Sequence, residues 1–166
     1  MSKKVDRTVN KILDSYFSEA ERSNIVIEDI IRQQGIDITY LSYLSDGMRG
    51  SYTVATKDNI RIEYSKETYD LYYMRKRFAL AHALGHIILG HRFHSNNERC
   101  DGISNYSSVV TDIEELEANE FARKILVPRD LFDAAVLRCK NFETICDYFD
   151  VSEVLMKMRI AEITGL

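Results

Sequence analysis

Hydrophobic residues recur at helical spacing near the start of the chain. Six apolar positions between residues 9 and 20 fall on one face and predict an amphipathic helix: Val9, Ile12, Leu13, Tyr16, Phe17 and Ala20. A second, shorter helix is predicted from about Ile27 to Gln34, and Gly35 ends it.

The pattern then changes from helical spacing to alternation. Apolar and polar residues alternate in three short segments: Ile36, Ile38 and Tyr40; Tyr52 and Val54; Ile60, Ile62 and Tyr64. Alternation of this kind predicts half-buried strands. The turn-forming residues Lys57, Asp58 and Asn59 separate the last two segments, so we expect a hairpin in a small, mostly antiparallel three-stranded sheet.

The most apolar segment of the chain runs from Tyr73 to about His91. Its apolar residues surround the predicted helix instead of forming one stripe, which is typical of a central, buried helix. Residues 92 to 110 lack periodicity and contain Ser, Asn, Asp and Gly, so they are predicted to form a long surface loop. Loops of this length in compact domains are often functional.

The last third of the chain is predicted to be helical. Thr111 and Glu114 have capping-box spacing and begin a helix that runs to Val127, where Pro128 ends it. Another helix is expected through Lys140. Residues 141–166 should add one or two more, resembling a helix-turn-helix unit. Ser152 is placed as the N-cap of the last helix. The predicted fold class is therefore α+β and mostly helical.

Length, composition and charge narrow the classes of protein. With 166 residues and 45% hydrophobic content, the chain can bury one core, so we expect a single domain over residues 1–166. A net charge of −4 argues against a protein whose main task is to neutralise a phosphate backbone. No signal-peptide core and no run of about 18 apolar residues is present, so we expect a cytoplasmic location without membrane insertion.

Two histidines four residues apart lie on the predicted buried helix. His82 and His86 project from one face about one turn apart, which suits two ligands of one zinc ion. Such a pair alone is more often part of a core, but residues 77–91 differ at one position from a zincin helix of HExxH form. That position is Ala83. It stands where a glutamate would take a proton from the attacking water, while zinc polarises the scissile carbonyl.

The third zinc ligand is expected from the helix that follows. On a continuous helix His91 would point about 140° away from His86, which favours a supporting or structural role. Four glutamates remain as candidates: Glu114, Glu115, Glu117 and Glu120. Glu115 lies about 60° from the centre of the inward face, and Asn119, one turn on, could orient it. Glu114 suits the capping box, and Glu117 is the alternative ligand.

Three cysteines are present without CxxC spacing, so no disulfide framework is expected: Cys100, Cys139 and Cys146. Cys100 differs from the others because it lies in the predicted long loop. A thiolate there could occupy the fourth coordination position of zinc and act as a switch, although an ordinary exposed thiol is the simpler interpretation.

Two motifs in order carry a family resemblance. The helix around HALGH is followed by the segment from Glu115 to Ala122 and a helix end at residues 126–128. Over roughly residues 50 to 130 the chain resembles the ImmA/IrrE family of metallopeptidases. The resemblance implies a zincin-like domain that binds Zn²⁺ through His82, His86 and Glu115. It also implies cleavage of an XRE-type helix-turn-helix repressor, which derepresses genes of a mobile element or of a stress or defence response.

Ala83 departs from the family at the catalytic position and leaves two explanations open. A glutamate changed to alanine would give an inactive form of the enzyme. A natural pseudoenzyme would bind zinc and the repressor without cleaving it. A third function, sequence-specific DNA recognition through the last helix, is disfavoured because Glu153, Lys157, Arg159 and Glu162 sum to zero charge.

Overall fold

The computed structural model describes residues 2–17, 25–41, 51–55, 60–65, 73–91 and 113–165. Within these ranges the fold is α+β and mostly helical. Its elements, in chain order, are α1 (Lys3–Tyr16), α2 (Ile27–Gln33), β1 (Asp37–Leu41), β2 (Ser51–Ala55), β3 (Ile60–Ser65), α4 (Tyr73–Leu89), α5 (Ile113–Leu126), α6 (Arg129–Val136), α7 (Phe142–Phe149) and α8 (Glu153–Thr164).

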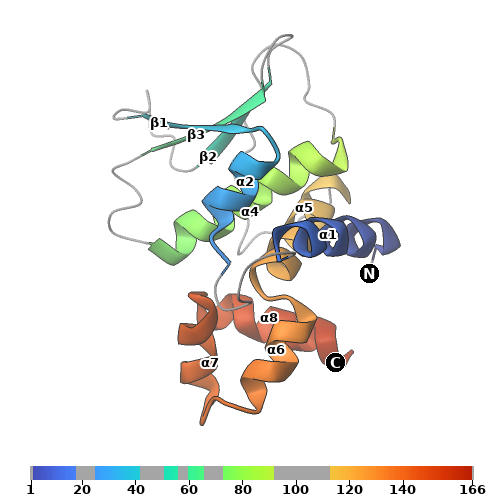
Figure 1. Cartoon of the computed structure of the whole chain (residues 1–166), viewed down its shortest axis with the longest axis vertical. Helices are drawn as coiled ribbons and strands as arrows, with labels where there is room; N and C mark the ends of the chain where they lie inside the picture. The colour runs from blue at the N-terminus through green and yellow to red at the C-terminus, as the bar shows by residue number, and fades with distance from the viewer. Residues whose placement is uncertain are drawn as a thin grey trace.

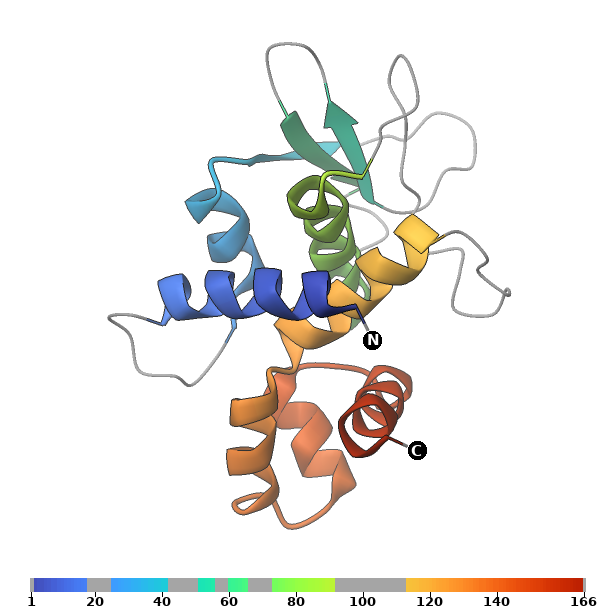
Figure 2. The same ribbon diagram turned by 90° about the vertical axis from the view of Figure 1, so that its right-hand side faces the viewer.

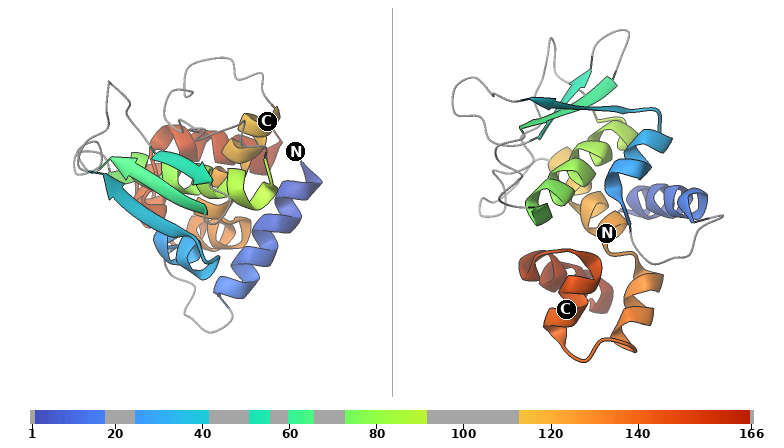
Figure 3. Two further views of the ribbon diagram at one scale, coloured as in Figure 1. Left: turned by 90° about the horizontal axis from the view of Figure 1, so that it is seen from above. Right: turned by 60° about the vertical axis from the view of Figure 1, so that its left-hand side comes forward.

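The sheet and the C-terminal helices lie at opposite ends of the molecule. Figure 1 shows the sheet at the top, α2 and α4 beneath it, and α6, α7 and α8 at the bottom. Turned by 90°, α4 and α5 lie side by side with α1 across them (Figure 2). Seen from above, the strands extend over α4 (Figure 3). Helix α4 is therefore covered by the sheet on one side and by helices on others, as its continuous apolar sequence predicts.

The sheet corrects one expectation. Its strand order is β1-β3-β2, in which β2 and β3 are antiparallel, as expected for a hairpin, whereas β1 and β3 are parallel. The sheet is mixed and not mostly antiparallel. Alternation identifies strands but not their partners, and β3 lies between β1 and β2. On β3, Ile62 and Tyr64 are buried, and Ile60, at the start of the strand, is exposed.

The N-terminal helices follow the predicted pattern with shifted bounds. Helix α1 begins at Lys3, six residues before the predicted start, because Val5 extends the buried stripe that contains Val9 and Ile12. It ends at Tyr16. Helix α2 matches its prediction closely, and the glycine after it, Gly35, has a φ of 72°. That left-handed conformation favours glycine and ends the helix.

A close approach of α4 and α5 depends on Gly85. A Cβ atom added at Gly85 would lie 3.0 Å from Cδ1 of Phe121 and 3.3 Å from the Cα atom of Ala118. Phe121 is fully buried, so its ring cannot move aside freely. The glycine within the histidine motif therefore lets the two helices come together, which brings the first turn of α5 close to the histidines.

The C-terminal helices agree in number with the sequence analysis but differ in extent. Pro128 directly precedes α6, which ends at Val136 and not at Lys140 as expected. Ser152 caps α8 by accepting a hydrogen bond from the backbone N–H of Leu155. Among the described residues, no helix is long and apolar enough to cross a membrane. Single-domain organisation stays a prediction.

Two basic residues near the start of α4, Lys76 and Arg77, contact neighbouring segments of the fold. Nζ of Lys76 lies 2.8 Å from Oε1 of Glu28 and sits over the Tyr64 ring. The guanidinium of Arg77 is buried and donates to the backbone carbonyls of Ile25 and Phe149. Lys76 and Arg77 therefore link α4 to neighbouring segments instead of forming a free cationic surface.

Candidate metal centre

Three side chains from two helices converge beside the α4–α5 contact. His82 and His86 are 1% and 3% exposed on α4, and Glu115 is half-buried in the first turn of α5. The two Nε2 atoms lie 2.9 Å apart. The Glu115 carboxylate lies 3.3 Å from Nε2 of His82 through Oε2 and 3.2 Å from Nε2 of His86 through Oε1. Within the described part of the chain, this is the group whose donor atoms could hold a metal ion.

The spacing of these atoms fits zinc. Zinc bonds of about 2.0–2.1 Å in tetrahedral geometry place two ligand atoms about 3.3 Å apart. The two histidine–carboxylate distances, each to a different oxygen of Glu115, are close to this value, and the histidine–histidine distance is shorter. Two imidazoles and a carboxylate also form a ligand set known from catalytic zinc sites, with a fourth position left for water or substrate.

Charge at the site suits a cation. Contact with His82, and then with His86, holds the pKa of the Glu115 carboxyl well below its ordinary value, although burial acts in the opposite direction. The carboxylate is therefore ionised at neutral pH and brings one negative charge to two imidazoles.

The second nitrogen of His82 has a partner on α5. Nδ1 of His82 lies 3.0 Å from Oδ1 of Asn119. Because an amide oxygen only accepts, His82 carries its proton on Nδ1 and leaves Nε2 as a lone pair facing the site. From its spacing in the sequence, Asn119 is expected to orient Glu115. In the structure its side-chain oxygen contacts His82.

The second nitrogen of His86 faces His91. Helix α4 ends at Leu89. The next residue, Gly90, has a φ of 70°, and the backbone N–H of His91 donates to the carbonyl of His86. This Schellman-type turn folds the chain back, so the two Nδ1 atoms lie 3.0 Å apart. The estimate of 140° for His91 assumed a continuous helix. Gly90, directly before His91, is the signal that could have corrected it.

The other glutamates of α5 have different partners. Oε2 of Glu117 lies 3.2 Å from Nε2 of His91, and its Oε1 accepts from the Ser2 hydroxyl. Glu120 accepts from the buried Lys124. Glu117, the alternative third ligand, therefore contacts His91 and not the pair of histidines that Glu115 joins. Burial lowers the pKa of His91, which favours its neutral ring at neutral pH.

The other residues that the sequence singled out lie partly inside and partly outside the described ranges. Ala83 is fully buried on α4, between the two histidines in sequence, and its methyl group can neither accept nor donate a proton. Cys100 and the capping residue Thr111 lie outside the described residues, so their roles stay predictions. Cys139 and Cys146 are free thiols on the C-terminal side, partly and fully buried.

A buried helix with two histidines one turn apart, joined by a glutamate from a second helix, is typical of zincin-type metallopeptidases. The chain belongs to the peptidase M78 family, because residues 31–161 match the family model described as the IrrE N-terminal-like domain. The match contains all three converging side chains and confirms the resemblance drawn from the two motifs. No curated protein matches the chain.

Proposed function

We propose that this chain is the zinc-dependent endopeptidase domain of a repressor-cleaving protein, lacking its general base. The observation that carries this proposal is the convergence of His82, His86 and Glu115 at distances that fit tetrahedral zinc. Membership of a metallopeptidase family supports the same chemistry independently.

Each residue of the site has a task in this proposal. His82 and His86 would each offer Nε2 to the metal, and Glu115 would offer one carboxylate oxygen and neutralise part of its charge. Zinc, when bound, supplies Lewis acidity that polarises a carbonyl and lowers the pKa of water. Asn119 fixes the ring of His82. Position 83 should hold a base that accepts a proton and returns it to the leaving amine, which alanine cannot do.

The proposed substrate is an XRE-type helix-turn-helix repressor, whose cleavage would derepress genes of a mobile element or of a stress or defence response. The proposed substrate is inferred from family membership.

A second candidate function is a non-catalytic one, and Ala83 favours it. A natural pseudoenzyme with this site would bind zinc and the repressor but leave the peptide bond intact. The alternative explanation is a glutamate-to-alanine change in an active enzyme. The two explanations predict different results when glutamate is placed at position 83.

Direct DNA recognition receives less support from α8. Arg159 is buried and bonded to the carbonyl of Val127 and to Glu162, and Lys157 is paired with Glu153. A helix that reads a groove normally presents a positive face. Here the cations of α8 are already partnered, and the helix carries no net charge.

The test of catalysis is the variant Ala83→Glu, assayed on a cognate repressor with zinc supplied. We expect cleavage to rise at least about 10²-fold, the usual contribution of a positioned general base. Ala83→Gln is the matched control, because glutamine has nearly the same size and cannot take the proton. It should remain as inactive as the parent.

The outcome separates the candidates. A gain for glutamate alone supports a peptidase that has lost its base. No gain, with zinc bound and the repressor present, would leave the non-catalytic binding protein as the better account.

A further inference from the structure

We propose that His91 and Glu117 are positioning residues that fix the proton of His86 on Nδ1 and so present its Nε2 as a lone pair to the metal. This inference rests on the metal site proposed above. It assigns a role to a histidine outside the motif and to a glutamate that is not a ligand.

The position of the proton on each ring decides which nitrogen can bind a metal. His86 can bind a metal through Nε2 only if its single proton is on Nδ1. That Nδ1–H then needs an acceptor, because the ring is buried. The atom in reach is Nδ1 of His91, 3.0 Å away, which can accept only if the proton of His91 is on Nε2.

Glu117 fixes the proton of His91. A carboxylate only accepts, and its Oε2 lies 3.2 Å from Nε2 of His91, so the proton belongs on that nitrogen. The chain of donors therefore has one consistent direction, from His86 through His91 to Glu117. Reversing it would require His91 to donate from both nitrogens and would place the proton of His86 on Nε2, where the metal should bind.

The backbone holds His91 in place. The left-handed residue Gly90 and the hydrogen bond from the backbone N–H of His91 to the carbonyl of His86 return the chain onto the last turn of α4. His91 is 6% exposed. A buried ring anchored by its own backbone loses little entropy when it forms the contact.

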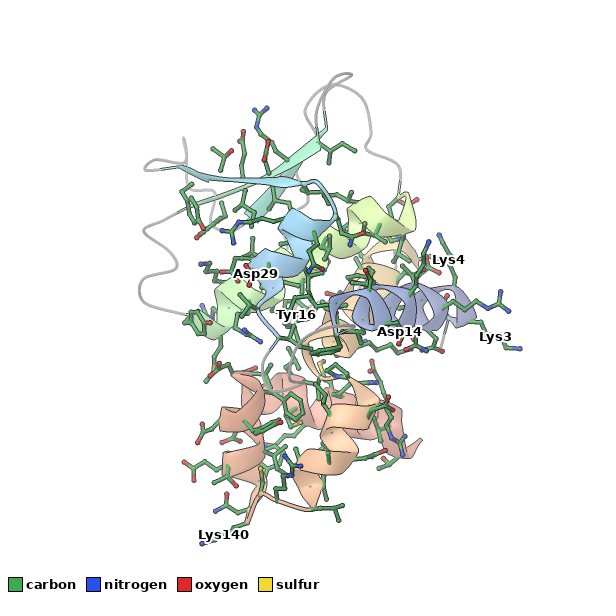
Figure 4. All side chains as sticks on the ribbon, in the orientation of Figure 1. Lys3, Lys4, Asp14, Tyr16, Asp29 and Lys140 are labelled. Atoms are coloured by element: carbon green, nitrogen blue, oxygen red, sulfur yellow. The ribbon has the colours of Figure 1, made fainter. Side chains whose placement is uncertain are left out.

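Residues at the N-terminal end of α1 also contact Glu117. The Ser2 hydroxyl donates to Oε1 of Glu117 at 3.2 Å, and Nζ of Lys4 lies 4.0 Å from Oε2. Nζ of Lys4 also donates to the carbonyl of Leu89, at the end of α4. Figure 4 shows Lys4 projecting from the start of α1 on that side of the molecule. The N-terminal end of α1 thus supports the metal site through Glu117.

The two histidines are therefore oriented differently. His82 donates to a neutral amide, whereas His86 donates through a second imidazole to a carboxylate. A carboxylate at the end of such a chain raises the basicity of the ligand, and removal of such partners typically weakens metal binding about 10- to 100-fold.

The test is the zinc affinity of the chain as it stands, measured by competition with a chromogenic chelator, so that it does not depend on catalysis. We expect His91→Phe to weaken zinc binding about 10- to 100-fold. His91→Gln should recover most of the loss, because its amide can accept from His86 and donate to Glu117. Rescue by glutamine distinguishes hydrogen bonding from simple filling of space.

A second pair of variants tests Glu117, at the other end of the series of hydrogen bonds that begins at His86. Glu117→Ala should weaken zinc binding, whereas Glu120→Ala, one turn on and bonded to Lys124 instead of a histidine, should leave the affinity unchanged even if it lowers stability. Thermal unfolding of each metal-free variant checks that it is folded. In the zinc-loaded parent, long-range ¹H–¹⁵N spectra should show His86 protonated at Nδ1.

The results distinguish this inference from the proposed function. A parent that takes up no zinc would overturn the metal site, and the inference with it. If the parent binds zinc and both His91→Phe and Glu117→Ala bind it with the same affinity, the inference is overturned while the metal site stands. A His91→Gln variant that binds no better than His91→Phe would also overturn the inference.

Discussion

Three carboxylates within two turns of α5 contact different side chains. Glu115 joins the two motif histidines, Glu117 joins His91, and Glu120 pairs with Lys124. Neighbouring residues on a helix point about 100° apart, so small differences in position separate these roles. From sequence alone, the same rule placed Glu115 nearer the inward face than Glu117 and Glu120, and the expected capping box set Glu114 apart.

Glutamine substitutions should reveal this division. Glu115→Gln should weaken zinc binding much more than Glu117→Gln, because only the first removes a charged ligand. The amide at position 117 can still accept a hydrogen bond from His91, so its effect should be small. Chelator competition on both variants measures the order. If Glu117→Gln had the larger effect, the third ligand would be misassigned.

Residue contacts beyond the motif were harder to predict. Periodicity gives the direction of a side chain on a regular helix, which sufficed to place His82 and His86 on one face. Glu115, which the structure brings to them, also needed the capping-box argument against Glu114. Periodicity fails where the helix ends, and His91 contacts His86 because of the turn at Gly90. The contact of Asn119 with His82 depends on the packing of α5 against α4, which sequence spacing does not specify.

At the scale of elements, the contact between α4 and α5 positions the site. The histidines come from one helix and the glutamate from the other, so the distance between them depends on how closely the helices approach at Gly85. Alanine is favoured over glycine within a helix by about 1 kcal/mol. Overpacking of a buried contact costs about 1–3 kcal/mol.

At Gly85 the cost of overpacking should exceed the gain in helix propensity. Gly85→Ala is expected to lower the free energy of unfolding by up to about 2 kcal/mol, because the new methyl meets Phe121 and the backbone of Ala118 and this cost exceeds the gain in helix propensity. Urea denaturation of the metal-free protein measures the change. The double variant with Phe121→Leu provides the control: the two substitutions should be less than additive, since leucine leaves room for the methyl. A more stable Gly85→Ala would contradict the proposed close approach.

The elements themselves followed from hydrophobic periodicity to different degrees. Helix α2 and the hairpin of β2 and β3 were predicted correctly, because each has a clear local signal. The parallel pairing of β1 with β3 was not, since it joins segments that are distant in sequence. Strand partners depend on how the sheet packs on α4, and a local sequence pattern does not predict this packing.

At the scale of the whole molecule, a bound metal would link the elements around the site. The proposed ligands come from α4 and α5, and Glu117, the partner of His91, also contacts Ser2 directly before α1. An unfolded chain would not hold the three ligands together, so zinc should bind the folded state more strongly. Zinc would then stabilise the fold in addition to any role in catalysis.

Removal of zinc should therefore lower the melting temperature. At free zinc about 100-fold above Kd the gain is about 2.7 kcal/mol, or roughly 5–10 °C for a chain of this size. Thermal unfolding with and without a chelator measures it. His86→Ala serves as the control and should show little shift. An equal shift in that variant would indicate zinc binding elsewhere.

In the proposed site His82, His86 and Glu115 hold one zinc ion even with alanine at position 83. The most direct test is the metal content of the zinc-replete chain as it stands, compared with a variant that carries both His82→Ala and His86→Ala. We predict about one zinc per chain for the first and essentially none for the second. A zinc-free parent, or a double variant that retains its zinc, would contradict the claim.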